Sequence, residues 1–185
     1  MNRRGLLRQN LKDAWQSAIT DDYHRQRINS ERSLQASLWW KLNVILPESR
    51  RMFIEPKLKA TVKALDGQVN PEFRFPDIVI CNTREVIGIV EVKYLPRAKP
   101  NWKKDLATFS WIHTNREQFV IQNIRYRGVT VDDREYPLSQ DVLFVWAGVH
   151  ALSGIDLSEH IAPDLSKHFL AMHAETTDGE HPAIR

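Results

Sequence analysis

The fold of this chain is constrained most strongly by one segment, FRFPDIVICNTREVIGIVEVKYL. It contains two strongly apolar runs, over 74–81 and 85–94, which are close enough to pair as a hairpin. Strands this apolar are typical of the centre of a sheet that is covered on both faces. The charged residues Asp77, Glu91 and Lys93 nevertheless lie inside them. A charge in a buried strand is costly unless it is paired or binds a cation, so these three residues require a reason.

The alternation of side chains along a strand decides which of these charges can meet. Residues of the same parity share a face, so Glu91 and Lys93 project together. Whether the hairpin loop is centred on Thr83 or one residue later, Asp77 lies diagonal to or directly opposite Glu91, with Cβ atoms roughly 5–8 Å apart. A two-residue loop would instead place Asp77 on the other face.

Two carboxylates at this distance repel each other, and one of them takes up a proton unless a cation lies between them. A hard divalent cation relieves the repulsion and keeps open positions for water and phosphate oxygens. The alternative is an ordinary salt bridge between Lys93 and an acid at the end of the sheet.

The remaining periodicities predict an α/β domain with a mixed sheet. Helical spacing of apolar residues predicts helices over about 5–20, from the N-cap Ser30 to before Pro47, from the cap Asn101 through Ile112, and over about 157–173. Strands are expected over 52–58, 74–81, 85–94 and 142–149, with an irregular hairpin over 119–137 and a turn-rich stretch over 65–71.

These elements predict one domain over 1–175, with its core at about 30–150, and a flexible tail over 176–185. From residue 30 to 149 the expected order is helix, three strands, helix, strand. The hairpin is antiparallel, whereas a helical crossover favours a parallel partner, so the sheet is expected to be mixed.

The residues Pro76-Asp77 and Glu91-Val92-Lys93, with 13 residues between Asp77 and Glu91, resemble the motif of the PD-(D/E)XK nuclease superfamily. That superfamily has an αβββαβ core, the same order as the elements expected here. The resemblance covers about 120 of the 185 residues. It implies a restriction-endonuclease-like fold, to which this chain adds an N-terminal and a C-terminal helix.

The resemblance also implies roles for the matching residues. Asp77 and Glu91 would bind Mg²⁺ or Mn²⁺, with the backbone carbonyl of Val92 as a third ligand. Lys93 would orient or activate the attacking water, or stabilise the charge that builds on the phosphate. The implied activity is metal-dependent hydrolysis of phosphodiester bonds in nucleic acid, by an endonuclease or exonuclease, with DNA as the expected substrate.

Two residues of the helix after Ser30 are further candidates. Glu31 shares a helical stripe with Leu34 and Leu38, so it is expected on the buried face. Many members of the superfamily carry an acid near the metal at this position, which makes Glu31 a possible metal ligand. Capping and helix-dipole effects in the first turn explain an acid there equally well. Gln35, one turn later, could line the same cleft.

The distribution of charge indicates where nucleic acid could bind. The formal net charge is only +3, but residues 1–100 carry 18 Lys plus Arg against 11 Asp plus Glu, whereas 101–185 carry 8 against 12. Around Trp102, just after the predicted site, lie four cations that could contact phosphates: Arg97, Lys99, Lys103 and Lys104. The alternative is that Trp102 packs in the core and the lysines are solvated.

Other features exclude several classes of protein. A single cysteine, Cys81, cannot form an internal disulfide or a cysteine-cluster zinc site. No apolar stretch approaches the roughly 18 residues of a membrane span, and no signal-peptide core is present, so a cytoplasmic protein without a membrane partner is expected.

Two other functions compete with the nuclease. One is a catalytically silent subunit of the same fold that binds nucleic acid or another protein, and the other is an unrelated α/β domain with a structural salt bridge. Because the predicted core uses nearly the whole chain, recognition of the substrate is expected to involve its structure or ends, a homodimer or a protein partner.

Overall fold

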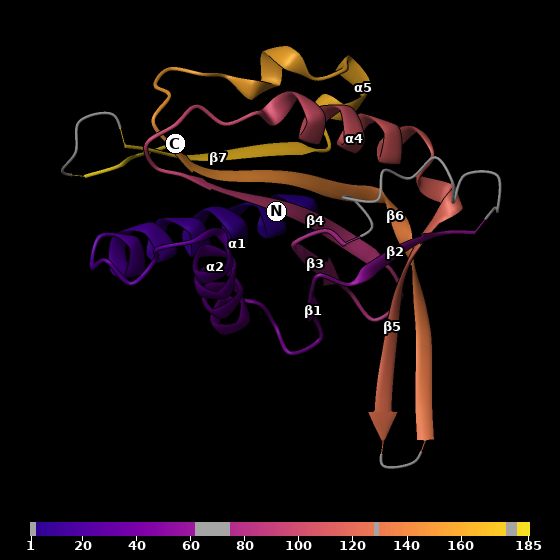
Figure 1. The fold of residues 1–185 in the computed structure, drawn as a ribbon. Helices are drawn as coiled ribbons and strands as arrows, with labels where there is room; N and C mark the ends of the chain where they lie inside the picture. Colours follow the sequence, from indigo (N-terminus) through magenta and orange to yellow (C-terminus); the bar gives the residue numbers. More distant parts are fainter. Residues whose placement is uncertain (1–2, 62–74, 128–129, 177–180) are drawn as a thin grey trace.

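A mixed sheet with helices on both faces forms the centre of the protein (Figure 1). The computed structural model describes residues 3–61, 75–127, 130–176 and 181–185. The helices are α1 (Arg3–Ser17), the π-helical turn η1 (Ala18–Tyr23), α2 (Glu31–Ile45), α4 (Trp102–Thr114), η3 (Arg116–Gln118), η4 (Leu157–His160) and α5 (Pro163–Ser166). No described helix has the length and apolar character needed to cross a membrane.

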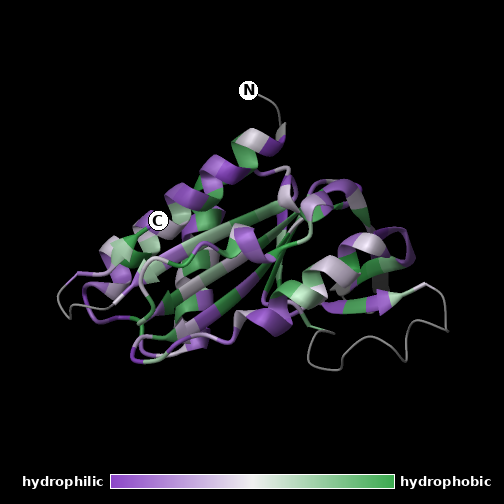
Figure 2. Ribbon diagram, turned by 90° about the horizontal axis from the view of Figure 1, so that it is seen from above, coloured by the Kyte–Doolittle hydropathy of each residue, from purple (hydrophilic) through white to green (hydrophobic). Residues whose placement is uncertain are grey.

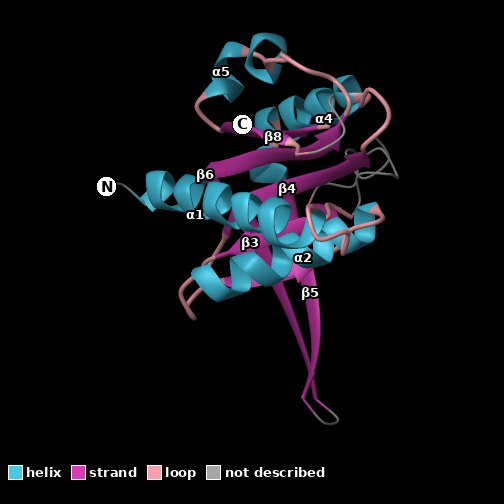
Figure 3. Ribbon diagram, turned by 90° about the vertical axis from the view of Figure 1, so that its left-hand side faces the viewer, coloured by secondary structure: helices cyan, strands magenta, loops and turns pink. Residues whose placement is uncertain are grey.

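The strands run in the order β1-β3-β4-β6-β5-β2, with β7 beside β6 and β8 beside β7. They are β1 (Arg51–Ile54), β2 (Lys57–Ala60), β3 (Ile78–Cys81), β4 (Val86–Leu95), β5 (Phe119–Arg127), β6 (Thr130–His150), β7 (Phe169–Glu175) and β8 (Ala183–Ile184). The long strand β6 joins two regions, because its first part pairs antiparallel with β5 and its second part pairs parallel with β4 and β7. The β5–β6 hairpin extends away from the rest of the molecule (Figures 1 and 3).

The predicted hairpin is confirmed as β3 and β4. Ile78 pairs with Val90 and Ile80 with Gly88, so this part of the register is centred on residue 84. All four residues of β3 are buried. The side-chain oxygen of Asn82 accepts hydrogen bonds from the backbone N–H groups of Arg84 and Glu85, at 2.7 and 2.8 Å.

Two apolar cores cover the faces of this sheet. The α4 face contains Val79 and Ile89 with Phe109, and the α1–α2 face contains Ile78 and Val90 with helix residues such as Leu38. Figure 2 shows hydrophobic stretches along the central strands. The strands β3 and β4 are therefore buried on both sides, as their composition predicts.

Local signals account for the limits of the main helices. The Ser30 side chain accepts a hydrogen bond from the Ser33 backbone at 3.2 Å and forms a capping box that starts α2. The helix ends before Pro47, as expected. Asn101 precedes α4, but its side chain makes no capping hydrogen bond. The order predicted from residue 30 to 149 is confirmed as α2, β1, β3, β4, α4 and β6, with β2 and β5 in addition.

Several boundaries differ from the prediction. The strand expected over 52–58 is divided into β1 and β2, because Glu55 has a positive φ of 47° before Pro56 and turns the chain. The hairpin over 119–137 is regular, since β5 and β6 pair continuously. The stretch 65–71 and the start of the strand expected at 74 lie outside the described residues.

The prediction of a helix over 157–173 is wrong, and the extra C-terminal helix of the predicted fold is therefore wrong too. Two short helices, η4 and α5, occupy its first part, and β7 begins at Phe169. β7 lies parallel to β6 and is buried along nearly all of its length. A strand covered on both faces shows no alternation of polar residues, so its apolar run looks helical in the sequence. At the end of the expected flexible tail, β8 pairs with β7.

Candidate active site

The β3–β4 hairpin brings Asp77 and Glu91 to neighbouring positions on one face of the sheet. Since Ile78 pairs with Val90, residues 77 and 91 occupy the next position of the same register, on the α4 face. The Asp77 carboxylate accepts a 2.6 Å hydrogen bond from the backbone N–H of Val92. This contact joins the start of β3 to the part of β4 that carries Glu91.

Both carboxyl groups are held in an environment that disfavours their charges. Burial raises the pKa of Asp77 to about 6, although the Val92 N–H and Lys93 act in the opposite direction. Burial, together with the nearby Asp77, raises the pKa of Glu91 to about 8, despite its ion pair with Lys93. Two adjacent acids with raised pKa values are typical of functional sites and of sites that bind cations.

The Lys93 ammonium lies between two carboxylates. Its Nζ is 2.6 Å from Oε1 of Glu91 and 3.7 Å from Oδ1 of Asp105. Burial by itself would lower the pKa of Lys93, but the attraction of Glu91, Asp105 and Glu31 raises it above the ordinary value. Lys93 is therefore a fixed positive charge at neutral pH.

Asp105 belongs to this site, although the sequence reasoning did not select it. Its side chain is only 5% exposed, and burial raises its pKa. The indole N–H of Trp146 donates a 3.0 Å hydrogen bond to its Oδ2. A signal was present in the sequence, because Asp105 stands three residues after Trp102 and four before Phe109, on the apolar stripe of the helix.

Gly148 allows Trp146 to reach Asp105. A Cβ atom on Gly148 would lie 2.2 Å from the Trp146 ring, so the ring lies directly against this glycine. Lys93 pairs with Gly148 in the register, and Gly148 pairs with His173 of β7. The indole thus occupies the space beside Lys93 on the α4 face and is fully buried there.

Of the two α2 candidates, Gln35 contacts the site and Glu31 does not lie on the buried face. Glu31 is exposed, contrary to the expectation that it faces the core, because it is the first residue of α2 and the helix becomes buried only from Leu34 onward. Its charge still acts on Asp77 and Lys93. Gln35 is 5% exposed, and its side-chain amide donates a 2.8 Å hydrogen bond to the backbone carbonyl of Asp77. Gln35 therefore fixes the position of Asp77 directly.

The expected phosphate contacts all lie on the surface. Arg97 and Lys99 are in the loop after β4, and Lys103 and Lys104 are in the first turn of α4, where all four are exposed. Trp102 is half-buried, packs against the core of the α4 face and stacks on His160 with ring centroids 4.3 Å apart. This supports the interpretation of Trp102 as a packing residue.

The donor set consists of carboxylate oxygens, which suit hard cations such as Mg²⁺ or Mn²⁺. Within the described residues, no group of three or more His, Cys, Asp or Glu side chains could hold a metal ion. Mg²⁺ requires fewer protein ligands, since it binds through one or two carboxylates and keeps several waters. The adjacent oxygen donors of Asp77 and Glu91 suit that pattern, and a cation there would relieve the repulsion between them.

No family model and no curated protein matches the chain. Two solved structures are similar to it, both of NucC. The P. aeruginosa ATCC27853 protein in its cAAA-bound form has 11% identity and a TM-score of 0.43, over 100% of this chain and 84% of that one. The E. coli MS115-1 protein in its apo form has 10% identity and a TM-score of 0.43, over 98% and 83%. Similarity at this level does not establish a shared activity, so the function is inferred from the site itself.

Proposed function

We propose that this chain is a metal-dependent nuclease that hydrolyses phosphodiester bonds of nucleic acid, with DNA as its substrate. One observation carries the proposal: Glu91 and Asp105 contact the ammonium of Lys93 on the α4 face, and Asp77, opposite Glu91, also feels its charge. A structural salt bridge needs only one acid for one lysine. The excess of buried acidic groups, whose ionisation burial disfavours, is explained by a site that receives a cation.

Asp77 and Glu91 would hold the Mg²⁺ or Mn²⁺ ion, with the backbone carbonyl of Val92 as a third ligand and Glu31 as a further acid for the same ion. Such an ion neutralises charge on the phosphate and lowers the pKa of a bound water. Gln35 and the Val92 N–H keep Asp77 in place through their hydrogen bonds. Both contacts hold the acid before any metal arrives, which reduces the cost of organising the site.

Lys93 would act as a positive charge and hydrogen-bond donor. Because its pKa is raised, it keeps its proton at neutral pH and is better suited to stabilise charge on the phosphate than to remove a proton from water. Asp105 is a positioning residue for Lys93. With Glu91 as a metal ligand, Asp105 would still provide the ammonium with a buried partner.

The test is to incubate the purified chain with plasmid, linear, branched and single-stranded DNA and with RNA, in Mg²⁺, Mn²⁺ or EDTA. Lys93→Ala should lower the cleavage rate by about 100-fold or more, the size expected for loss of a transition-state charge. Lys57→Ala changes an exposed lysine of β2 and should cleave like the wild type. EDTA should abolish cleavage.

Other outcomes separate the competing functions. Equal cleavage by Lys93→Ala would show that the activity belongs to a contaminant or that the residue is wrongly assigned. Binding of Mn²⁺ and of nucleic acid without cleavage of any substrate would favour the catalytically silent subunit. Calorimetry should show a Mn²⁺ site that Asp77→Ala loses, and no site in the wild type would remove the metal-dependent proposal. A homodimer stays a prediction, which sedimentation of the purified chain would test, and a protein partner also stays a prediction.

A further inference from the structure

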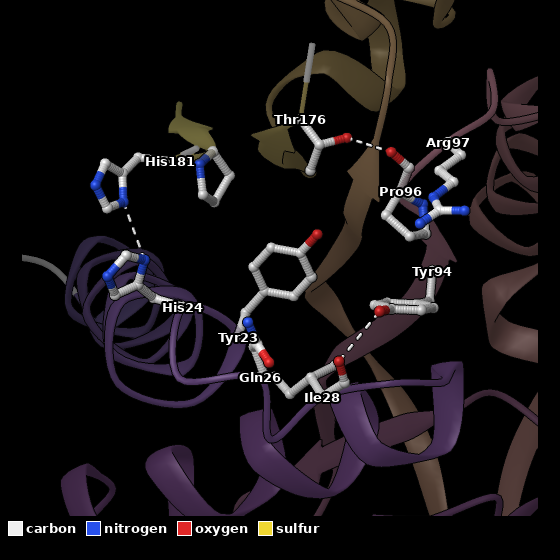
Figure 4. A pocket seen from close by; sticks show the side chains of 10 residues that line it. Tyr23, His24, Gln26, Ile28, Tyr94, Pro96, Arg97, Thr176 and His181 are labelled. Carbon is white, nitrogen blue, oxygen red and sulfur yellow. Dashed lines mark hydrogen bonds between the residues drawn. The ribbon is translucent and has the colours of Figure 1, made fainter. Parts of the chain in front are cut away.

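A cavity of about 510 Å³ opens beside the carboxyl-terminal end of β4 (Figure 4), and its described lining includes none of Asp77, Glu91 and Asp105. It lies between the end of η1, the carboxyl-terminal end of β4 and residues that follow β7. Tyr94 lines it and directly follows Lys93, but consecutive residues of a strand point to opposite faces. Tyr94 packs with the core of the α1–α2 face. The cavity is therefore distinct from the candidate active site, although both lie near the end of β4.

The charge of this cavity suits an anion. None of its described lining residues is acidic, and Arg97 contributes a permanent positive charge. Within the described part of the chain, Arg97 forms no ion pair. Burial raises the pKa of Tyr94, and the nearby Arg97 acts in the opposite direction. An exposed guanidinium on a wall whose described residues carry no carboxylate is suited to a phosphate group.

Aromatic rings supply the rest of the lining. Tyr94 is fixed by a 3.1 Å hydrogen bond from its hydroxyl to the carbonyl of Ile28, and the ring of Tyr23 meets it edge-on at 6.2 Å between centroids. The Tyr23 hydroxyl points into the cavity (Figure 4) and forms no hydrogen bond to a described residue. A flat ring of a ligand could stack on either tyrosine, and the Tyr23 hydroxyl could form a hydrogen bond with the polar edge of that ring.

Two histidines form another part of the wall. The Nδ1 atoms of His24 and His181 lie 2.9 Å apart, so one donates and the other accepts a hydrogen bond. Each ring keeps its Nε2 atom for a further hydrogen bond. His181 precedes β8, so pairing of β8 with β7 brings the end of the chain to this cavity.

We propose that this cavity binds a nucleotide, with its phosphate on Arg97 and its base against Tyr23. The volume lies within the range of small-molecule sites, and a phosphate joined to a planar base matches one cation beside aromatic rings. The choice of ligand rests on the proposed function, because a nuclease meets nucleotides both as strand ends and as free products. The cavity itself does not depend on the metal site.

Binding should be measured by calorimetry on the full chain carrying Lys93→Ala, in EDTA, so that neither metal nor cleavage affects the result. The probes are dAMP, deoxyadenosine and inorganic phosphate. dAMP should bind at least about 10-fold more tightly than either part, because only dAMP engages both the cation and the rings. Arg97→Ala should weaken dAMP binding about 10-fold or more, and Tyr23→Leu should weaken it as well.

Arg25→Ala is the matched control, since Arg25 is an exposed arginine between the lining residues His24 and Gln26 but does not itself line the cavity. It should bind dAMP like its parent. A single-stranded oligonucleotide with a 5′-phosphate, compared with the same strand without it, separates a strand end from a free nucleotide as the source. No dAMP binding, or dAMP binding that Arg97→Ala leaves unchanged, would overturn the proposal. These assays omit metal and catalysis. Nucleotide binding can therefore be found even if the nuclease test fails, and it can be absent even if that test succeeds.

Discussion

Replacement of Gly148 by alanine tests whether the packing of Trp146 holds the candidate site together. A Cβ atom at this position would lie 2.2 Å from the indole, whereas ordinary contact begins at 3.4 Å. The ring must therefore move by about 1.2 Å, the difference between these distances. Trp146 is fully buried, so neighbouring side chains must move with it.

The expected cost has two parts. Overpacking of a well-filled core destabilises by about 1–3 kcal/mol. The Trp146 indole now donates at 3.0 Å to Asp105, and a shift of this size breaks that bond. Loss of a donor to a buried carboxyl group costs about 1–3 kcal/mol more. The sum of roughly 2–6 kcal/mol corresponds to a fall in Tm of roughly 5–20 °C for a chain of this length.

Gly88→Ala provides the matched control in the neighbouring strand. Its Cβ would lie 3.5 Å from the Ile80 side chain, which is ordinary contact. Neither Gly88 nor Gly148 has a positive φ, so alanine is not strained at either position. Gly88→Ala is expected to be neutral or to stabilise by about 0.4–1 kcal/mol, because alanine reduces the entropy of the unfolded chain.

Thermal and urea unfolding, followed by circular dichroism, should separate the two variants. If Gly148→Ala unfolds at the same temperature as Gly88→Ala, the close packing of Trp146 against residue 148 is refuted. If Gly148→Ala unfolds earlier but cleaves nucleic acid like the wild type, Trp146 and Asp105 stabilise the fold without positioning Lys93.

Three further predictions concern the acid cluster. Asp105→Asn should lower cleavage about 10-fold through the weaker hold on Lys93 while changing Tm little, and unchanged cleavage would make Asp105 structural only. The raised pKa values of Asp77 and Glu91, about 6 and 8, mean that stability of the metal-free protein is present at low pH and lost between about pH 4 and 8. Unfolding in EDTA should therefore be easier at pH 8 than at pH 6 by about 1 kcal/mol or more, and Mg²⁺ should reverse this; equal stability would argue against two ionising neighbours. Gln35→Leu should cost about 0.5–1.5 kcal/mol in urea unfolding, since it removes the amide donor to the Asp77 carbonyl and leaves only the Glu55 N–H at 3.1 Å, whereas a neutral result would show that this remaining donor is sufficient.

Local patterns were sufficient for the hairpin and its charges. The two apolar runs predicted β3 and β4, and parity placed Glu91 and Lys93 on one face. The register of Ile78 with Val90 then selected direct opposition of Asp77 and Glu91 from the alternatives that the turn allowed. Turn geometry had to decide this, because a shift of one residue reverses every side chain of a strand.

Contacts between distant segments decided the rest of the site. Asp105 reaches Lys93 only because α4 packs on β4 and β6, and Trp146 can bond to Asp105 only because Gly148 leaves room for its ring. The exposure of Glu31 depends on where α2 first touches the sheet, which helical periodicity does not specify.

The sequence by itself determined an α/β core and two acids with a lysine on a central hairpin, because alternation and helical spacing are local properties of the chain. Only the tertiary structure decided that residues 169–175 form a strand, since that choice depends on pairing with β6. It also assembled the separate cavity around Arg97 from segments that are far apart in the sequence. Such a cavity leaves no periodic pattern, because its walls meet only after the sheet and its helices have packed.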